Sequence, residues 1–413
     1  MTDDSATASL AQDRPRGGPL AGFIVSAGKR MLNWEPEGSL LVVLPNGGAV
    51  RFGRGGDEAL LHLHNFAVII RAIRRGSLGF ADAYLAGDID SPDLVRLFRF
   101  FVRNREQLHA TGRRLFKSRF ADRIRHRLRR NSKTGSRENI SEHYDLGNDF
   151  FRLWLTPDLF YSSGYFASEA TTLEAAQEAK AALVLDALRL ERGHEMLEIG
   201  SGWGGLSLRA ARNYGARAHG VTLSREQLAH ARANAASAGF AENCRFDLRD
   251  YRDLAGQYDR IASVEMIEAV GEENWPAYFQ TLHDRLKPGG IAALQAITID
   301  EAIFGDYRRR ADFIQRHIFP GGMLPTKTAL AQHAERAGLR FETVQTFARS
   351  YVRTLQEWRR RFEANWPEIE RLGFDCRFRR KWRYYLAYCE AGFLEGSIDV
   401  GVYRLTRPAL SAS

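Results

Sequence analysis

The sequence predicts an α/β protein whose larger part is built on a parallel β-sheet, with a small α/β domain in front of it. The first observation is an alternation of apolar segments and helical patterns that becomes regular after residue 195. The second is a glycine-rich turn at Gly200, Gly202 and Gly205, which ends one apolar segment and opens a helical pattern. Strands that alternate with helices in this way are typical of βαβ units and a parallel sheet.

Size and composition set further limits. Single cores rarely grow past about 300 residues, so the 413-residue chain is expected to hold two domains. It has 59 basic and 50 acidic residues, and the formal net charge of +9 favours an acidic partner, either nucleic acid or an anionic membrane surface. The cysteines lack paired or metal-ligand spacing, which indicates a reducing compartment and no metal site. Without a long apolar run or a signal-peptide pattern, a cytoplasmic protein is expected.

The N-terminal part reads as a small domain behind a leader. Residues 1–18 are polar and are expected to be a disordered leader. Apolar segments at 40–44 and 49–52 flank an Asn-Gly pair, which predicts a β-hairpin. A helical pattern follows at 92–103. Because this part contains no catalytic constellation, residues 19–122 are interpreted as an accessory domain.

Residues 123–137 are predicted to form a basic linker, because arginines crowd its first half and a Gly-Ser pair closes it. Cationic side chains near an anionic membrane are worth about 1 kcal/mol each, so the linker is a candidate for holding phosphate headgroups. A solvated basic linker without lipid contacts is the alternative interpretation.

Residues 138–413 form the predicted catalytic domain. An amphipathic helix is expected over 173–190, and Ser224 with Gln227 has the spacing of a capping box at the start of another helix. Right-handed crossovers bring the carboxyl ends of parallel strands to one edge of the sheet, where we expect the site. Residues 300–405 are predicted to be helical and aromatic. Strands are expected at 195–200, 217–223, 244–249, 260–265 and 290–299.

The glycine turn is interpreted as a ligand site. Glycines permit a sharp turn and close approach, and a helix N-terminus offers unpaired N–H groups. The usual ligand would be a dinucleotide phosphate, but Glu198 would repel a phosphate and suits a cation. The next strand ends at Thr222, without the acidic residue of dinucleotide sites. The loop resembles that of S-adenosylmethionine-dependent methyltransferases, and a turn that only packs is the alternative.

From about residue 137 to the C-terminus, a series of motifs resembles cyclopropane-fatty-acid synthases and the related mycolic acid methyltransferases. Several motifs in one order are more specific than the glycine loop alone. They lie at 143–149, 161–163, 198–205, 220–224, 250–253, 265–271, 318–322 and at Tyr351. The resemblance implies a Rossmann-like class I methyltransferase sheet with helical insertions.

The resemblance also implies the reaction. Such enzymes transfer the methyl group of S-adenosylmethionine to a cis double bond of an unsaturated phospholipid acyl chain, and the resulting carbocation closes to a cyclopropane ring. The N-terminal domain would help to engage the inner face of the membrane, with which the cytoplasmic enzyme would associate peripherally. A homodimer is common in the family, and no nucleic-acid partner is expected.

The same resemblance assigns the base of the reaction to a bound bicarbonate ion. Its ligands would be the side chains of Ser163, Glu268, Gln295 and Tyr351, with the backbone N–H of Ile297. Ser163 stands at the position of a thiol, and Gln295 at that of a histidine, as in synthases of the plant type. Serine and glutamine both donate hydrogen bonds, so an anion site is feasible.

The S-adenosylmethionine site is expected to draw on several strand ends. The candidates for the methionyl part are Glu198, Gly200, Ser201 and Gly202, and those for the ribose are Thr222 and Gln227. Arg249 and Asp250 are the candidates beside the adenine. The segment expected to cover the cofactor contributes Tyr144, Tyr161 and Ser162. Structural alternatives exist for several candidates: a salt bridge for Glu198, a helix cap for Gln227, a core position for Tyr351 and a helix-dipole contact for Glu268.

An apolar tunnel for the acyl chain would draw on aromatic side chains, although such a stripe of aromatic residues is more often part of a core than of a tunnel. The candidates are Phe304, Phe313, Phe319, Trp358, Tyr384, Tyr385 and Phe393. His143 and His317 are the alternative bases.

Three other functions stay open. The first keeps the fold and donor but gives a methyl- or methylene-branched chain without a ring. The second is a nucleic-acid methyltransferase, which the basic charge permits, although an Asn-Pro-Pro-Tyr motif and a Pro-Cys pair are absent from the sequence. The third is a lipid-binding protein of the same fold without catalysis.

Overall fold

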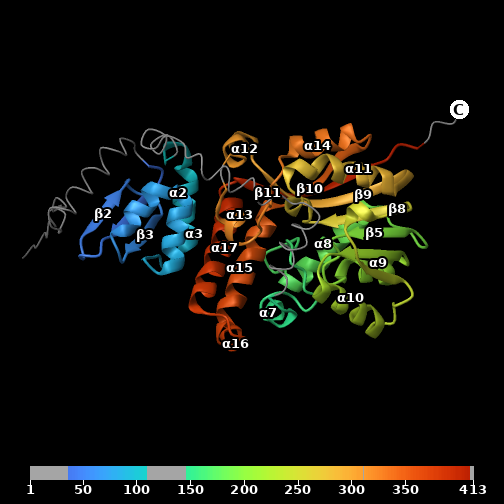
Figure 1. The fold of residues 1–413 in the computed structure, drawn as a ribbon, viewed down its shortest axis with the longest axis horizontal. Coiled ribbons are helices and arrows are strands. Elements are labelled where there is room, and N and C mark those ends of the chain that lie inside the picture. The colour runs from blue at the N-terminus through green and yellow to red at the C-terminus, as the bar shows by residue number, and fades with distance from the viewer. Residues whose placement is uncertain (1–35, 109–145, 310, 410–413) are drawn as a thin grey trace, which may run out of the picture. The chain divides into compact units, whose positions relative to one another are not determined.

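The computed structural model describes residues 36–108, 146–309 and 311–409, and the chain divides into two compact units, residues 1–117 and 118–413 (Figure 1). The predicted leader at 1–18 and the predicted basic linker at 123–137 lie outside the described residues. Each unit is described by itself below.

The first unit contains a four-stranded sheet in the order β2-β1-β3-β4. β1 (Ser39–Val43) pairs antiparallel with β2 (Ala49–Phe52), which confirms the predicted hairpin, and parallel with β3 (Glu58–Leu63). The short β4 (Ile89–Asp90) completes the sheet. Helices α2 (Ala67–Ala86) and α3 (Leu94–Arg103) accompany it, and α3 buries five apolar side chains. The unit is therefore a small α/β fold, as predicted.

The second unit is built on a seven-stranded, mostly parallel sheet in the order β10-β11-β9-β8-β5-β6-β7. The five predicted strands are present and parallel, within a few residues of their expected ends. They are β5 (Glu195–Ile199), β6 (Arg217–Thr222), β7 (Cys244–Leu248), β8 (Tyr258–Val264) and β9 (Leu286–Ile299). The expected class of fold is confirmed.

The prediction that residues 300–405 are helical is wrong for two segments. β10 (Arg340–Thr346) and β11 (Ile398–Thr406) are strands, and β11 inserts antiparallel between β9 and β10. Four consecutive residues of β11, residues 400–403, are buried. A strand covered on both faces lacks the two-residue alternation by which a strand is recognised in a sequence.

Helices cover both faces of this sheet. α11 (Trp275–Arg285) and α14 (Lys327–Arg336) lie on one face, and α9 (Gly205–Tyr214) and α10 (Arg225–Ser237) on the other (Figure 1). Aromatic and aliphatic side chains of α11 and α14 join residues of β5, β8 and β9 in one hydrophobic core. The predicted helix at 173–190 is α8 (Leu173–Ala187).

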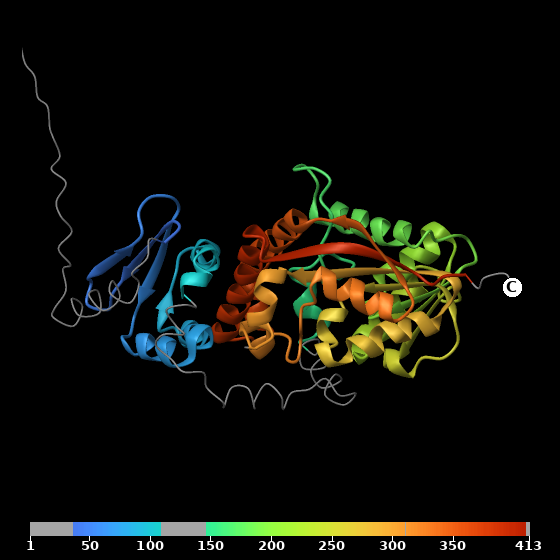
Figure 2. The ribbon, with the colours of Figure 1, turned by 90° about the horizontal axis from the view of Figure 1, so that it is seen from above.

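A group of helices lies beyond one end of the sheet. α15 (Ala348–Ala364) and α17 (Cys376–Leu394) run side by side there (Figures 1 and 2). The remaining described helices are α7 (Asn148–Arg152), α12 (Glu301–Tyr307), α13 (Phe313–His317) and α16 (Trp366–Arg371). Because α15 and α17 carry most of the aromatic candidates, they form one wall of the expected site region.

The capping box predicted for α10 is present only in part. The Ser224 hydroxyl accepts from the Gln227 backbone N–H at 3.3 Å, as expected of a cap. The reciprocal bond is different, because the Ser224 N–H donates to the Thr222 hydroxyl at 3.1 Å. The Gln227 side chain instead accepts from that hydroxyl at 2.8 Å. Gln227 is therefore directed toward the end of β6.

Candidate active site

Many of the predicted site residues lie at or near the carboxyl ends of neighbouring parallel strands. β6 and β7 lie on one side of β5, and β8 and β9 lie on the other, so the strand order reverses at β5. Such a switch point is where open α/β sheets bind their ligands. The glycine loop follows β5, Thr222 ends β6, and Glu265 follows β8.

The glycine loop leaves room for a ligand. Gly200 has φ 80° and Gly202 has φ 52°, backbone conformations that side chains rarely adopt. A Cβ on Gly202 would meet no atom within 4 Å. The Ser201 hydroxyl is buried and has no hydrogen-bond partner among the described residues. An open backbone and an unsatisfied hydroxyl fit the polar methionyl part of S-adenosylmethionine.

Glu198 lies behind this loop, at the end of β5. The side chain is 3% exposed, and one oxygen accepts from both the backbone N–H and the hydroxyl of Ser207 on α9. Burial raises the pKa of Glu198 to about 7, although the bonds from Ser207 oppose this shift. The carboxylate therefore faces the start of α9, and a cation nearby would favour its charged form.

The ribose and adenine candidates differ in their surroundings. Thr222 and Gln227 are buried and hydrogen-bonded to each other at the end of β6. Asp250 is also buried and forms an ion pair with Arg252 at 2.7 Å. Arg249 is exposed, and its backbone N–H donates to the Thr222 carbonyl at 3.1 Å. Thus the candidates lie around the ends of β6 and β7, and Arg252 is a neighbour that sequence reasoning missed.

The covering segment around Ser162 is held from two sides. On the α8 side, Lys180 donates to the Ser162 hydroxyl at 2.7 Å and Gln177 donates to its carbonyl at 2.8 Å. On the α15 side, the Gly164 N–H donates to the Thr354 hydroxyl at 3.1 Å. The Tyr161 hydroxyl contacts that of Tyr385 at 3.0 Å. Tyr144, the third candidate of this group, lies outside the described residues.

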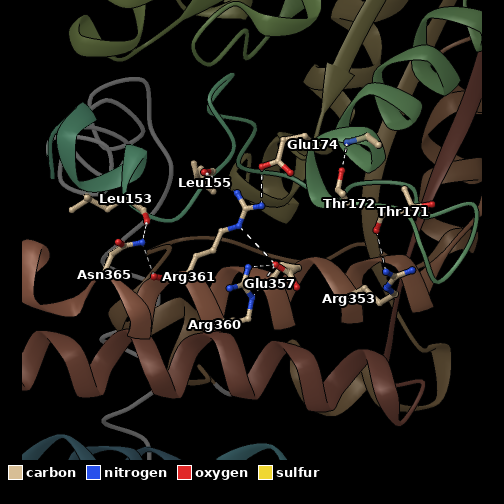
Figure 3. Close-up of polar contacts among 11 residues, drawn as sticks. Leu153, Leu155, Thr171, Thr172, Glu174, Arg353, Glu357, Arg360, Arg361 and Asn365 are labelled. Atoms are coloured by element: carbon tan, nitrogen blue, oxygen red, sulfur yellow. Dashed lines mark hydrogen bonds and ion pairs between the residues drawn. The ribbon is translucent and has the colours of Figure 1, made fainter.

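Side chains near and along α15 also bond to neighbouring parts of the chain before and after this segment. Arg353 donates to the backbone carbonyl of Thr171 (Figure 3) and to those of Ser168 and Glu169. Its guanidinium lies 4.1 Å from the Phe166 ring centre. Further along the helix, Arg361 pairs with Glu174 at 2.8 Å, and Asn365 donates to the Leu153 carbonyl at 2.7 Å (Figure 3). These contacts fix the helix that carries Tyr351 against the segment that carries Ser163.

Glu265 is the centre of the expected anion site, and sequence reasoning assigned it no role. Its Oε1 accepts from the Ser163 backbone N–H at 2.9 Å and from the Gln295 amide at 2.8 Å. Its Oε2 accepts from the Tyr351 hydroxyl at 2.6 Å. The residue has φ 48°, in the left-handed region. Burial raises its pKa, and the three donors and Lys180 oppose the shift.

Glu268 follows within one turn. Its Oε1 accepts from the Ile297 backbone N–H at 2.5 Å, while its Oε2 has no hydrogen-bond partner among the described residues. Burial, followed by the negative charge of Glu265, raises the pKa of Glu268 to about 8. A pKa of about 8 keeps Glu268 mostly protonated at neutral pH, whereas three hydrogen-bond donors and the charge of Lys180 favour the ionised form of Glu265 against its burial.

The five expected bicarbonate ligands are close together, but they do not form an open anion site. The donors of Ser163, Gln295 and Tyr351 are directed at Glu265, and that of Ile297 at Glu268. The Ser163 hydroxyl donates to the Gly164 carbonyl at 2.8 Å, so the backbone N–H of Ser163, not its side chain, is the donor. The arrangement does not fit a further anion on these donors.

Lys180 is another residue that sequence reasoning missed. It is 0% exposed, its ammonium group lies 3.9 Å from the Phe160 ring centre, and burial lowers its pKa to about 7. The charges of Glu265 and Glu198 act in the opposite direction. The available signal was its position on the buried stripe of α8, where a lysine is unexpected.

Most of the aromatic candidates form one cluster beside the glutamates. Tyr351 stacks on Phe393 at 4.5 Å between ring centres, and Trp358 packs against Tyr161 at 5.4 Å. Phe319 contacts Tyr385, and Phe313 contacts Tyr384. Phe304 is separate, because it packs on Trp275 of the sheet core.

His317, one of the two alternative bases, lies at the end of α13. His317 packs on the ring of Phe313 at 5.1 Å between ring centres. His143 lies outside the described residues. Within the described residues, no helix is both long and apolar enough to cross a membrane.

Comparisons with known proteins agree with this geometry. The family described as mycolic acid cyclopropane synthetase matches residues 131–403. The tuberculostearic acid methyltransferase UfaA1 of Mycobacterium tuberculosis is 36% identical over 422 residues, which cover 98% of each chain. A cyclopropane-fatty-acyl-phospholipid synthase of Escherichia coli is 35% identical over 360 residues, which cover 84% of this chain and 87% of that protein.

A solved structure shares the fold of the second unit. The crystal structure of mycolic acid cyclopropane synthase CmaA1 complexed with SAH and CTAB superposes with a TM-score of 0.61 at 31% identity. The match covers 65% of this chain and 98% of that one. The chain belongs to the mycolic acid cyclopropane synthetase family, and is an S-adenosylmethionine-dependent methyltransferase of lipid acyl chains.

Proposed function

We propose that the enzyme transfers the methyl group of S-adenosylmethionine to a cis double bond of an unsaturated phospholipid acyl chain and closes the product to a cyclopropane ring. The observation that carries this proposal is the pair of acidic side chains, Glu265 and Glu268, between the glycine loop and an aromatic wall. An alkene is a weak nucleophile, so it must be held in line with an activated methyl and kept from water.

We propose that the glycine loop and the ends of β6 and β7 hold the donor, which when bound supplies an electrophilic methyl on a sulfonium. Gly200, Ser201 and Gly202 would contact its methionyl part, and Glu198 would balance positive charge from behind the loop. The further proposed contacts are Thr222 and Gln227 to the ribose, Arg249 and Asp250 beside the adenine, and Tyr144, Tyr161 and Ser162 over the donor.

The aromatic cluster would line the path of the acyl chain. Tyr351 donates its hydroxyl to the Glu265 carboxylate, and its ring packs against those of Trp358 and Phe393. Aromatic faces attract cations, so a positive charge on the lipid carbon would be stabilised there. The low exposure of Trp358 and Tyr351 would keep water away from that charge.

A second candidate product is a methyl- or methylene-branched chain without a ring. The whole-length relative named a tuberculostearic acid methyltransferase favours this outcome. Both products gain one carbon, so the mass of a cyclopropane and that of a methylene-branched chain are equal. Proton NMR of the fatty acids separates them: upfield ring protons support the proposed function, and olefinic or branched methyl signals in their place favour the second candidate.

We propose that the protein works at the inner face of the cytoplasmic membrane, where its substrate lies. The first unit would engage lipid, and the basic linker would contact anionic headgroups. The net charge of +9 supports attraction to such a surface. A homodimer is proposed by analogy with the family, and its test is the molecular mass in solution by light scattering.

A further inference from the structure

Glu265 already binds the donors that an anion would need. Ser163 donates from a loop, Gln295 from β9 and Tyr351 from α15, and all three bonds end on the one carboxylate. Bicarbonate presents the same planar pair of oxygens as a carboxylate, so a donor set that suits one suits the other. The position expected for bicarbonate therefore holds a side chain of the protein itself.

The charges nearby also oppose a further anion. Glu268 lies within the same turn, and its shielded Oε2 has no hydrogen-bond partner among the described residues. Lys180 is the buried cation whose charge acts on Glu265. Acidic groups that share a site of low polarity cannot all ionise together, since each raises the pKa of the others. A bicarbonate ion would add a third acidic group beside this lysine.

The backbone of Glu265 gives an independent sign of function. Its φ of 48° is rare for a residue with a side chain, and its N–H donates to the Gln295 carbonyl at 2.7 Å. Glycine would adopt this conformation without strain. A strained residue persists where its surroundings fix it, and such residues concentrate at active sites.

We infer that the Glu265 carboxylate takes the place of bicarbonate and is itself the base, so that this enzyme works without bicarbonate. The inference rests on the proposed methyl transfer. The π electrons of the lipid double bond form a bond to the methyl carbon while the donor's C–S bond breaks. Glu265 then takes a proton from the added methyl, and the freed C–H electron pair closes the ring. The proton leaves to water after product release, which restores the carboxylate.

A fixed carboxylate next to a carbocation risks forming an ester, and the contacts of Glu265 reduce this risk. Both of its oxygens already accept hydrogen bonds, which lower their nucleophilicity. The same bonds hold the carboxylate plane in place, so it can reach a proton without closing on the neighbouring carbon.

The test compares the full-length protein in buffer stripped of carbon dioxide with the same buffer containing bicarbonate at tens of millimolar. Substrates are S-adenosylmethionine and unsaturated phospholipid vesicles. We expect equal rates for the wild type in the two buffers. Glu265→Gly removes the base and the backbone strain together, so its rate in stripped buffer should fall by at least about 100-fold. Added bicarbonate should then restore much of it, because the three donors become available.

Glu265→Gln is the matched control, since it keeps the size of the side chain but cannot accept a proton. It should be inactive in both buffers and bind S-adenosylmethionine within about twofold of the wild type by calorimetry. In thermal melts, bicarbonate should stabilise only the glycine variant. A wild type that loses activity without bicarbonate, or an active glutamine variant, would overturn the inference. A wild type that never methylates lipid, with or without bicarbonate, would instead refute the proposed function.

Discussion

Glu265 and Glu268 are three residues apart and have different surroundings. Three donors and a lysine charge favour the ionised form of Glu265, whereas the bonds that favour ionised Glu268 come from backbone N–H groups. Environments that separate the pKa values of two acids commonly mark the acid and the base of a reaction. The proton-accepting role therefore falls to Glu265, and a protonated Glu268 lies beside it.

The first residue-scale prediction concerns Tyr351, whose hydroxyl donates to Glu265 at 2.6 Å. Tyr351→Phe keeps the ring that stacks on Phe393 but removes this bond. We expect kcat to fall by about 10- to 100-fold, because the carboxylate loses one of its fixed donors. S-adenosylmethionine affinity, measured by calorimetry, should stay within about twofold. An equal loss of S-adenosylmethionine affinity would instead place Tyr351 in the S-adenosylmethionine site.

The second concerns the pH dependence of stability. Glu268 has a pKa raised from its ordinary 4.5 to about 8, so between these values the unfolded chain ionises a carboxyl that the folded protein keeps protonated. The stability that the protonated Glu268 carboxyl contributes is therefore fully present below pH 4.5 and is lost as the pH rises to about 8.

Glu268→Gln removes this loss. Since each pKa unit corresponds to about 1.4 kcal/mol, the variant should gain on the order of 3–4 kcal/mol of unfolding free energy relative to wild type between pH 5 and pH 8. Urea titrations at the two pH values measure it. Parallel changes in the two proteins would mean that Glu268 is ionised in the folded state.

At this scale, the residues of the site were predicted from the sequence more accurately than the hydrogen bonds that they form. Ser163, Gln295 and Tyr351 are together because their motifs fall at a strand end, in a loop and on a helix that meet there. Glu265 received no role because the resemblance assigned the anion to bicarbonate. Its left-handed backbone and its three donors depend on tertiary packing, which no local pattern encodes.

Among the elements, α15 has the largest effect on the site. Its first half bonds to residues 163–166 through Thr354 and Ser350, and its arginines bond to the segment that follows. These bonds satisfy backbone groups of a segment that has little regular structure of its own. The helix thereby sets the distance between Tyr351 and Glu265.

The element-scale prediction is that Arg353→Ala loosens this segment. Three backbone carbonyls lose a charged donor, so the free energy of unfolding should fall by about 1–3 kcal/mol. Activity should fall as well, because Ser163 is held less firmly. Arg360→Ala on the same helix is the control, since Arg360 is exposed and bonds to Glu357 of its own helix. Equal effects of the two substitutions on melting and on turnover would exclude a fastening role for Arg353.

Element prediction succeeded where periodicity was clear. The five parallel strands and α8 follow apolar runs separated by helical patterns, and their observed ends lie close to those expected. β10 and β11 were missed because each lies among helices and neither shows a clean alternation. The sequence thus predicted the half of the sheet that carries the glycine loop, but not its antiparallel edge.

For the whole molecule, the small α/β fold of the first unit was predicted from its hairpin and helical patterns. Its lipid-engaging role stays a proposal, because a charge balance identifies a class of partner and not a surface. Several arginines of α15 and α17 are also neutralised locally, as in the pairs Arg359–Glu390 and Arg379–Glu363. A net count of charges does not reveal such pairing.

The whole-molecule prediction is salt-sensitive membrane binding. With a net charge of +9, the protein should sediment with anionic phospholipid vesicles at about 0.1 M salt and be released at several-fold higher salt, because exposed charges are screened. Vesicles of zwitterionic lipid are the control and should bind less. Salt-dependent binding to RNA without affinity for vesicles would contradict a membrane role.

The most direct measurement follows an isotopically labelled methyl group from S-adenosylmethionine into lipid. Vesicles of a cis-unsaturated phospholipid and of its saturated counterpart are incubated with the full-length protein, and the released fatty acids are separated and counted. The account predicts label in the acyl chains of the unsaturated lipid alone. Label in the headgroup, in the saturated chains or in no lipid at all would contradict it.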